Sequence, residues 1–322
     1  MKQLSFSQYE YQLQSKKTRR HAFLQEMESV IPWESLIEIV QPFYYADGEG
    51  VGRKAYKLDL MLRIYFMQNW FSMSDPGMED ALRDISSMRD FAGFVSYSEP
   101  VPDETTILNF RHLLENNQLT EALFQAVNSI LESHGLRVSS GTIVDATIIS
   151  APTSTKNASN SRDPEMRHTR KGNQYYFGMK AHIGVDEESG MVHSTVFTPA
   201  NMNDVTQAHH LLDGKETHAW GDAGYQGVEK RAECSDVCWI TAQRPGKVRA
   251  INPNSVLGKL ARKIEYLKAS IRAKVEHPFR VIKQQFGYQK TRYKGLYKNA
   301  CQLYTLFMLS NIWMFRKKLA PI

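Results

Sequence analysis

The chain has 322 residues and a formal net charge of +6, and its 42% hydrophobic and 23% charged residues are ordinary usage for a globular protein. This composition excludes a disordered or fibrous chain, and only three cysteines exclude a disulfide-stapled scaffold. The N-terminus lacks the apolar run of a signal peptide, and the most apolar stretch, 303–315, falls short of the roughly 20 residues of a membrane span. We therefore expect a soluble, cytoplasmic protein.

The first part of the chain is predicted to be helical. Apolar residues recur at helical spacing in the stretches 23–30, 56–69, 76–91, 103–116 and 120–135. The third and fourth stretches could form a helix-turn-helix-like unit whose polar face offers Thr106, Asn109, Arg111 and His112. An ordinary pair of amphipathic packing helices explains the pattern equally well, because the turn between them is long for a compact motif.

From Gly141 onward the pattern changes to that of a mixed α/β domain. Strands are predicted at 142–149, 175–185, 191–197, 218–221 and 237–242. Helices are predicted at 204–212 and, with many basic residues, at 256–286. The polar stretch 152–172 is predicted to be a long loop that either follows a DNA backbone or is a plain surface loop. This order of elements predicts a mixed sheet with helices packed on it.

Positive charge is concentrated in one part of the chain. The window 244–298 contains 15 lysines and arginines and only two acids, so it carries +13 while the rest of the chain carries −7. Such a block favours a phosphate-rich partner, such as a nucleic acid, over a plain solvated basic face.

Three acids stand where local rules disfavour them. Asp145 interrupts an apolar strand, Asp222 follows a short strand within a glycine-rich turn, and Glu276 is one of the two acids of the basic window. Each acid also has a purely structural explanation. Asp145 could belong to a buried salt bridge, Asp222 could form a turn, and Glu276 could form an ion pair along its helix. Two strand-end aspartates and a helix glutamate can also converge on one sheet edge. There they would repel one another unless cations neutralised them, and hard oxygen ligands select Mg²⁺ or Mn²⁺.

These acids lie in sequence blocks that resemble the bacterial insertion-sequence transposases of the DDE type. The blocks are Val144-Asp145-Ala146-Thr147, Gly221-Asp222-Ala223-Gly224-Tyr225-Gln226-Gly227 and Arg272-x3-Glu276-x6-Lys283. The last resembles the third signature of the group written Tyr-x2-Arg-x3-Glu-x6-Lys. Ala269 occupies the place of the signature tyrosine, and Tyr266 lies one helical turn earlier. The resemblance extends over nearly the whole chain.

The resemblance implies a ribonuclease H-like catalytic domain at 139–322, preceded by an arm and helix at 1–40 and a helical DNA-binding or dimerisation domain at 41–138. It implies that Asp145, Asp222 and Glu276 are catalytic and hold two Mg²⁺ ions, with Mn²⁺ as a possible substitute. It also implies that Arg272 and Lys283 contact DNA phosphates near the site. Further candidate DNA contacts are Arg280, Lys171 and Lys180.

The implied function is transposition by a nucleoid-associated bacterial enzyme. Water would nick the element at its terminal inverted repeats, and the freed 3′-hydroxyl would attack target DNA. The partners would be double-stranded DNA and a second copy of the chain, in a synaptic homodimer. Two alternatives remain: a related metal-dependent nuclease that cuts without joining, and a transposase-derived DNA-binding protein without catalysis.

Three smaller features allow narrower expectations. Pro278, two residues after Glu276, predicts a kink or a short break in the basic helix. His182 could approach the site, although a structural histidine is the commoner explanation. Cys234 and Cys238 lack a second cysteine pair, so a zinc site there has little support.

Overall fold

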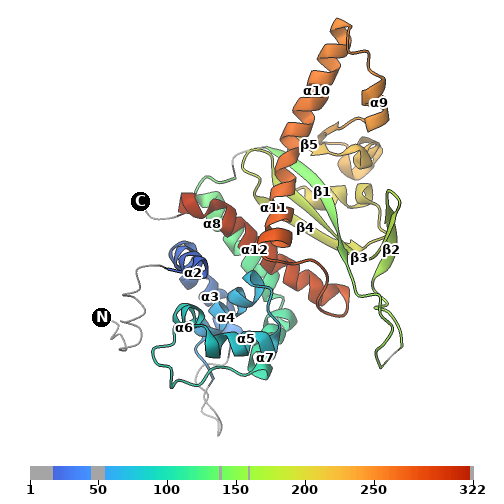
Figure 1. Ribbon diagram of the computed structural model, residues 1–322. Coiled ribbons are helices and arrows are strands. Elements are labelled where there is room, and N and C mark those ends of the chain that lie inside the picture. Colours follow the sequence, from blue (N-terminus) through green and yellow to red (C-terminus); the bar gives the residue numbers. More distant parts are fainter. Residues whose placement is uncertain (1–16, 45–54, 138–139, 159, 320–322) are drawn as a thin grey trace. The chain divides into compact units, whose positions relative to one another are not determined.

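The computed structural model of the protein describes residues 17–44, 55–137, 140–158 and 160–319. The chain divides into two compact units (Figure 1): unit 1 contains the residues up to Val127 and from Met308 onward, and unit 2 contains Asn128–Phe307. The boundaries fall inside helices α8 (Leu119–Ser133) and α12 (Leu296–Leu319). None of the described helices combines the length and the hydropathy that a membrane span requires.

The predicted helical N-terminal region is confirmed. Unit 1 is built from α4 (Leu58–Trp70), most of whose residues are buried, and from helices around it. Side-chain caps start several helices: Ser74 accepts a hydrogen bond from the Gly77 N–H, and Asp103 accepts one from the Thr106 N–H. The other helices of this region are α2 (Arg19–Val30), α3 (Trp33–Val40), α5 (Asp75–Asp84), α6 (Ser86–Ala92) and α7 (Glu104–Asn116).

The helix expected at 76–91 is in fact two helices. Ile85 has an extended backbone, with φ −110° and ψ 103°, so α5 ends there and α6 follows before α7. On α7, Arg111 is buried and forms ion pairs with Asp75 and Glu115. These contacts favour the interpretation of α5 and α7 as packing helices over a helix-turn-helix pair.

Unit 2 is built around a mixed six-stranded sheet, as predicted. Its strands are β1 (Gly141–Ser150), β2 (Arg167–Lys171), β3 (Gln174–Asp186), β4 (Val192–Pro199), β5 (His218–Gly221) and β6 (Cys238–Thr241). They run in the order β2-β3-β1-β5-β6, with β4 also paired to β3. Strand β3 is antiparallel to β1, β2 and β4, whereas β5 is parallel to β1 and β6 is parallel to β5. The expected architecture, a helical region followed by a mixed sheet with helices packed on it, is confirmed.

Strand β2 lies within the stretch 152–172, which the sequence predicts to be a loop. It forms a hairpin with β3, paired from Arg167↔Gly178 to Lys171↔Gln174, and Gly172 turns the chain with φ +61°. All five residues of β2 are polar and four of them are exposed, so the strand has no apolar alternation that could predict it.

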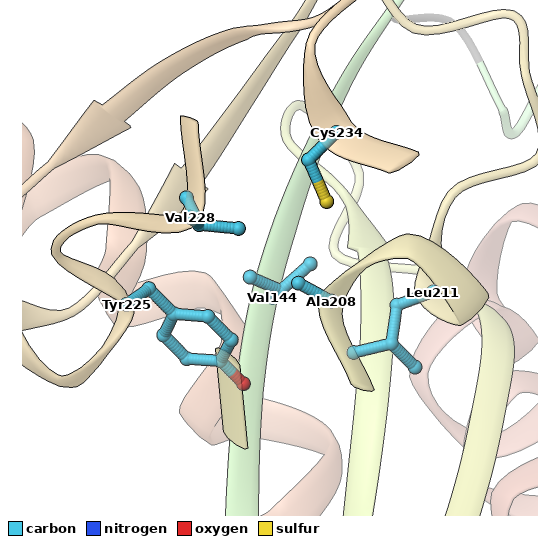
Figure 2. Close-up of a cluster of buried hydrophobic side chains, with 6 residues drawn as sticks. All are labelled: Val144, Ala208, Leu211, Tyr225, Val228 and Cys234. Atoms are coloured by element: carbon cyan, nitrogen blue, oxygen red, sulfur yellow. The ribbon is translucent and has the colours of Figure 1, made fainter. Parts of the chain in front are cut away.

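One face of the sheet is covered by short 3-10 helices. Val144 of β1 packs there against Ala208 and Leu211 of η2 (Asp204–Leu211), which replaces the α-helix expected at 204–212. Figure 2 shows this cluster, which is completed by Tyr225 of η3 (Ala223–Tyr225), Val228 of η4 (Val228–Lys230) and Cys234 of η5 (Ala232–Cys234). Successive side chains of a strand point to opposite faces, so Asp145 faces away from this cluster.

The basic helix expected at 256–286 changes its winding three times. Helix α10 (Val256–Arg272) leads into the 3-10 turn η6 (Ala273–Val275), then α11 (Glu276–Arg280), then the π-helical turn η7 (Val281–Gln285). The short break expected near Pro278 is found at η6, which interrupts the α-helical winding shortly before this residue. Pro278 itself lies in the first turn of α11, where a missing N–H is tolerated. Figure 1 shows α10 extending away from the sheet, and α9 (Pro245–Ala250) precedes it.

Candidate functional site

The sheet places Asp145 next to the end of strand β5, which Asp222 follows. Strands β1 and β5 are parallel, and their last pair is Ile143↔Trp220. Each aspartate lies two residues beyond that pair, Asp145 in the continuation of β1 and Asp222 immediately after β5. Because the two strands are parallel and in register, positions two residues beyond their last pair are neighbours, so the two carboxyl groups come from adjacent positions although Asp145 lies within β1.

The glycines around Asp222 fix its turn. The Asp222 carboxylate accepts a hydrogen bond from the Gly224 N–H at 2.7 Å and caps η3. A Cβ atom at Gly224 would lie 2.8 Å from Asp222 Oδ1, and one at Gly221 would lie 2.8 Å from the Cβ of Tyr225. Side chains at either glycine would therefore displace the aspartate or the buried tyrosine.

Glu276 belongs to a helix, α11, and its charge acts on Asp145 of the sheet. It is the first residue of α11 and is exposed. The preceding turn, η6, contacts both β1 and β3. Lys274 of that turn donates a hydrogen bond to the Glu187 carbonyl at 2.6 Å, which ties it to the sheet.

Asp145 has a pKa raised to about 7. Burial is the main cause, and the negative charges of Asp222 and Glu276 raise the pKa further. Opposing this, the Ala146 N–H donates a hydrogen bond to Asp145 Oδ1 at 2.7 Å, and the Arg272 guanidinium adds a positive charge. The structure thus brings the other two predicted acids and Arg272 within electrostatic range of Asp145.

The chemistry of this group fits a divalent cation. Three carboxylates supply hard oxygen donors, and a bound cation would offset the mutual repulsion of the charges of Asp222 and Glu276 with that of Asp145. Among the residues that the structure describes, no three His, Cys, Asp or Glu side chains are already grouped so that they could hold a metal ion. The three carboxylates are therefore suitable ligands, but their side chains are not grouped closely enough in this structure to hold an ion.

Buried polar atoms also remain unsatisfied beside the acids. Within the described part of the chain, neither Tyr225 Oη nor Arg272 Nε has a hydrogen-bond partner. Burial raises the pKa of Tyr225 well above its usual value, and the charges of Asp145, Asp204 and Asp222 add to the effect. The Tyr225 hydroxyl and the Asp204 carboxylate thus belong to the electrostatic surroundings of the site.

Sequence reasoning missed these two residues. Tyr225 stands in the same glycine-rich block as Asp222, but the sequence argument about that block concerned the aspartate and the glycines and gave the tyrosine no role. Asp204 opens η2, and nothing in its local pattern points to a site.

The predicted DNA contacts have different surroundings. Lys283 is half-buried and donates hydrogen bonds to Thr147 Oγ1 at 2.5 Å and to the Ile148 carbonyl at 3.4 Å. Burial lowers its pKa, and the nearby charge of Lys171 lowers it further. Lys180 forms an ion pair with Asp204 at 2.8 Å and also donates to the Met202 carbonyl. Arg280 and Lys171 are exposed.

The remaining candidates have structural roles. His182 is fully buried and hydrogen-bonded to Thr198 Oγ1 at 2.9 Å, and burial lowers its pKa to about 4. Cys234 is buried in the cluster of Figure 2 and Cys238 is exposed, and both are free thiols.

Comparisons with known proteins found two family models and a solved structure that are similar to this chain. A family model described as "Transposase DDE domain" matches residues 137–312, and one described as "Transposase domain (DUF772)" matches residues 11–113. Among solved structures, the chain is similar to a piggyBac transposase synaptic complex with hairpin DNA determined by cryo-electron microscopy. That similarity has 10% identity and a TM-score of 0.47, and it covers 92% of this chain and 73% of the other.

Proposed function

The chain belongs to the transposase DDE domain family, and we propose that it moves an insertion sequence. In this proposal it binds the terminal inverted repeats, cleaves the DNA at the element ends and joins the resulting 3′-hydroxyl to target DNA. The observation that supports the proposal is that Asp145 and Asp222 occupy adjacent positions at β1 and β5, with the charges of Asp222 and Glu276 both acting on Asp145.

We assign metal binding to these three acids. Mg²⁺, or Mn²⁺ in its place, would be held by Asp145, Asp222 and Glu276 as two ions. Divalent cations at such a site activate the attacking oxygen and stabilise the leaving oxygen of a phosphodiester displacement. The chain's own contribution is to hold Asp145 on a paired strand, Asp222 in a glycine-constrained turn and Glu276 at the start of a helix.

The DNA partner is proposed from the positive charges around the acids. Among the residues that the structure describes, Arg272 Nε has no hydrogen-bond partner, and the charge of Arg272 acts on Asp145, which supports a phosphate-binding role for its guanidinium. The exposed Lys171 and Arg280 extend this positive charge outward. We propose that DNA also contacts the helical region 41–138 and that two copies act together as a homodimer on paired ends.

A cleavage-and-joining assay tests the proposal. The substrate is a labelled duplex carrying the element's own end, incubated with Mg²⁺ and a target plasmid. Wild type should give nicked ends and joined products, whereas Asp222→Ala and Glu276→Ala should give neither while still binding the duplex. Nicks without joining would support the nuclease alternative. Binding without chemistry in Mg²⁺ and Mn²⁺ would support a DNA-binding protein and contradict the proposal.

A further inference from the structure

Strand β3 extends beyond its neighbours in the sheet. Its residues 178–186 pair with β1, and 179–185 also pair with β4, whereas among the described strands 174–176 pair only with β2. The residues 167–176 therefore form a two-stranded ribbon at the edge of the sheet, which we call the β2–β3 ribbon (Figure 1). A two-stranded ribbon without further strands is marginally stable in water, so its own contacts must hold its shape.

The tip of the ribbon is held by its own side chains. Gly172 and Asn173 form a two-residue turn, in which Gly172 has φ +61°. The Arg170 guanidinium donates hydrogen bonds to the Gly172 carbonyl at 2.9 Å and to Asn173 Oδ1 at 3.3 Å. It also lies 5.4 Å from the centre of the Tyr175 ring. The tip therefore has a defined shape before any partner binds, which lowers the entropy cost of binding.

Two amide side chains, those of Asn173 and Gln174, lie at this tip, and both are exposed. The carbonyl oxygen of each accepts a hydrogen bond, for Asn173 from Arg170 and for Gln174 from the Tyr176 hydroxyl at 2.6 Å. A carbonyl oxygen has a second lone pair, and neither contact uses the amide N–H donors. Both amides can therefore still donate and accept, as an amide does when it binds N6 and N7 of adenine in the major groove.

The ribbon is also positively charged. The stretch 167–185 contains four lysines and arginines and no acid. Burial lowers the pKa of Lys283, and the charge of Lys171 lowers it further, so the positive potential of the ribbon extends to Lys283. Basic edge strands also protect sheets from aggregation. That role requires neither oriented amides nor a tyrosine such as Tyr175 that is 74% exposed, so binding of a polyanion explains more of the ribbon.

A two-stranded antiparallel ribbon fits into the major groove of B-DNA, where each base pair presents a distinct pattern of donors and acceptors. From these observations we propose that the β2–β3 ribbon enters the major groove of the bound DNA and that Asn173 and Gln174 read adenines there. The ribbon contributes sequence specificity and is separate from the three acids. The inference rests on the proposed function in that the element's own end is taken as the bound duplex.

Two variants remove the proposed base contacts. Asn173→Ala and Gln174→Ala each remove one amide and leave the charge of the ribbon unchanged. The matched control is Gln25→Ala on α2, because Gln25 is also exposed and its carbonyl oxygen also accepts a hydrogen bond, from Lys17. Circular dichroism and thermal unfolding confirm that each variant is folded.

The first readout is sequence preference, measured by fluorescence anisotropy without divalent metal. The probes are a labelled duplex carrying the element's own end, a set of duplexes in which each base pair is replaced in turn, and a duplex of scrambled sequence. Asn173→Ala and Gln174→Ala should bind the end duplex on the order of tenfold more weakly than wild type does. Each should lose the wild-type preference at its own adenine, and both should bind the scrambled duplex like wild type. Gln25→Ala should match wild type on every duplex.

The second readout identifies the groove. Replacing an adenine with 7-deazaadenine removes the N7 acceptor, which lies in the major groove. At the adenines found in the first readout, this replacement should weaken binding by wild type and Gln25→Ala, but not by the variant that lacks the corresponding amide.

The inference is overturned if Asn173→Ala and Gln174→Ala keep the wild-type preference at every base pair. It is also overturned if they weaken binding to all duplexes equally, which would indicate contacts to the DNA backbone only. Neither readout needs cleavage. A wild type that shows the predicted preferences but cuts no DNA would contradict the proposed function and still support the ribbon as a base reader.

Discussion

The pKa of the Asp145 carboxyl group depends on the charges of both Asp222 and Glu276. It is placed on a central strand, where burial raises its pKa, and the carboxylates of Asp222 and Glu276 raise it further. The sequence singles out these three residues as candidates, because an acid in an apolar strand or in a basic helix is a visible misfit. The ion pair between Lys180 and Asp204 could not be predicted from the sequence, because the two residues are 24 positions apart and only the fold brings them together.

Glu276→Gln should lower the pKa of Asp145. The substitution removes one negative charge from the surroundings of the Asp145 carboxyl group, so its ionised form becomes less unfavourable. The pKa should fall below 7 but stay above the ordinary 3.8, because burial, the larger cause, is unchanged. A carbon-13 titration of the Asp145 side chain, without metal, measures this shift. An unchanged or higher pKa would show that Glu276 does not act on Asp145.

At the scale of elements, the sequence predicts where strands and helices occur better than it predicts their winding. The strands β1, β3, β4 and β5 follow from β-branched and apolar runs. The hairpin strand β2 is polar and exposed, so only its pairing with β3 reveals it. The 3-10 and π-helical turns on either side of α11 depend on contacts with the sheet, such as Lys283 with Thr147, that no local pattern encodes.

Strands β3 and β4 each contain a buried histidine, which predicts how stability depends on pH. Burial lowers the pKa of His182 and of His193 to about 4 from 6.5. Between these values the unfolded chain binds protons that the folded chain does not, so folding stability falls as the pH falls from 6.5 toward 4. Each histidine contributes roughly 2 to 3 kcal/mol to this loss. Asp145, whose pKa is raised, acts in the opposite direction.

The comparison of wild type with His193→Gln isolates one histidine. The two ring nitrogens of His193 are hydrogen-bonded to the hydroxyl groups of Thr142 and Ser194. The charges of Arg137, Asp213 and Asp186 also act on its pKa. Urea unfolding at pH 7, 6, 5 and 4.5 should show a smaller loss of stability in the variant than in wild type. Equal losses in the two proteins would contradict a neutral, buried His193.

At the scale of the whole molecule, charge is unevenly distributed along the chain. The window 244–298 carries +13, and its exposed residues include Lys259, Arg262 and Lys263 of α10. This asymmetry could be recognised from the sequence, because it requires only counting. The division into two compact units could not be recognised from the sequence, because unit 1 combines the N-terminal helices with residues from Met308 onward.

DNA binding should depend steeply on salt, and α10 should account for part of that dependence. Replacing Lys259, Arg262 and Lys263 with glutamine should reduce the slope of log K against log salt by about 0.9 for each DNA phosphate that these side chains neutralise. Lys215→Gln, at an exposed position outside the window, is the control and should leave the slope unchanged. The measurement is fluorescence anisotropy of a labelled end duplex at several salt concentrations. A slope unaffected by the triple substitution would exclude α10 from the DNA interface.

The central claim, that Asp145, Asp222 and Glu276 form one metal site, can be tested directly with Fe²⁺ in place of Mg²⁺. With ascorbate and peroxide, bound iron generates radicals that cut the nearby backbone, and the fragments are identified by mass spectrometry. We predict cuts close to all three acids, suppressed by excess Mg²⁺ and absent in Asp222→Ala. Cuts near only one of the acids, or at positions remote from all three, would contradict a shared site.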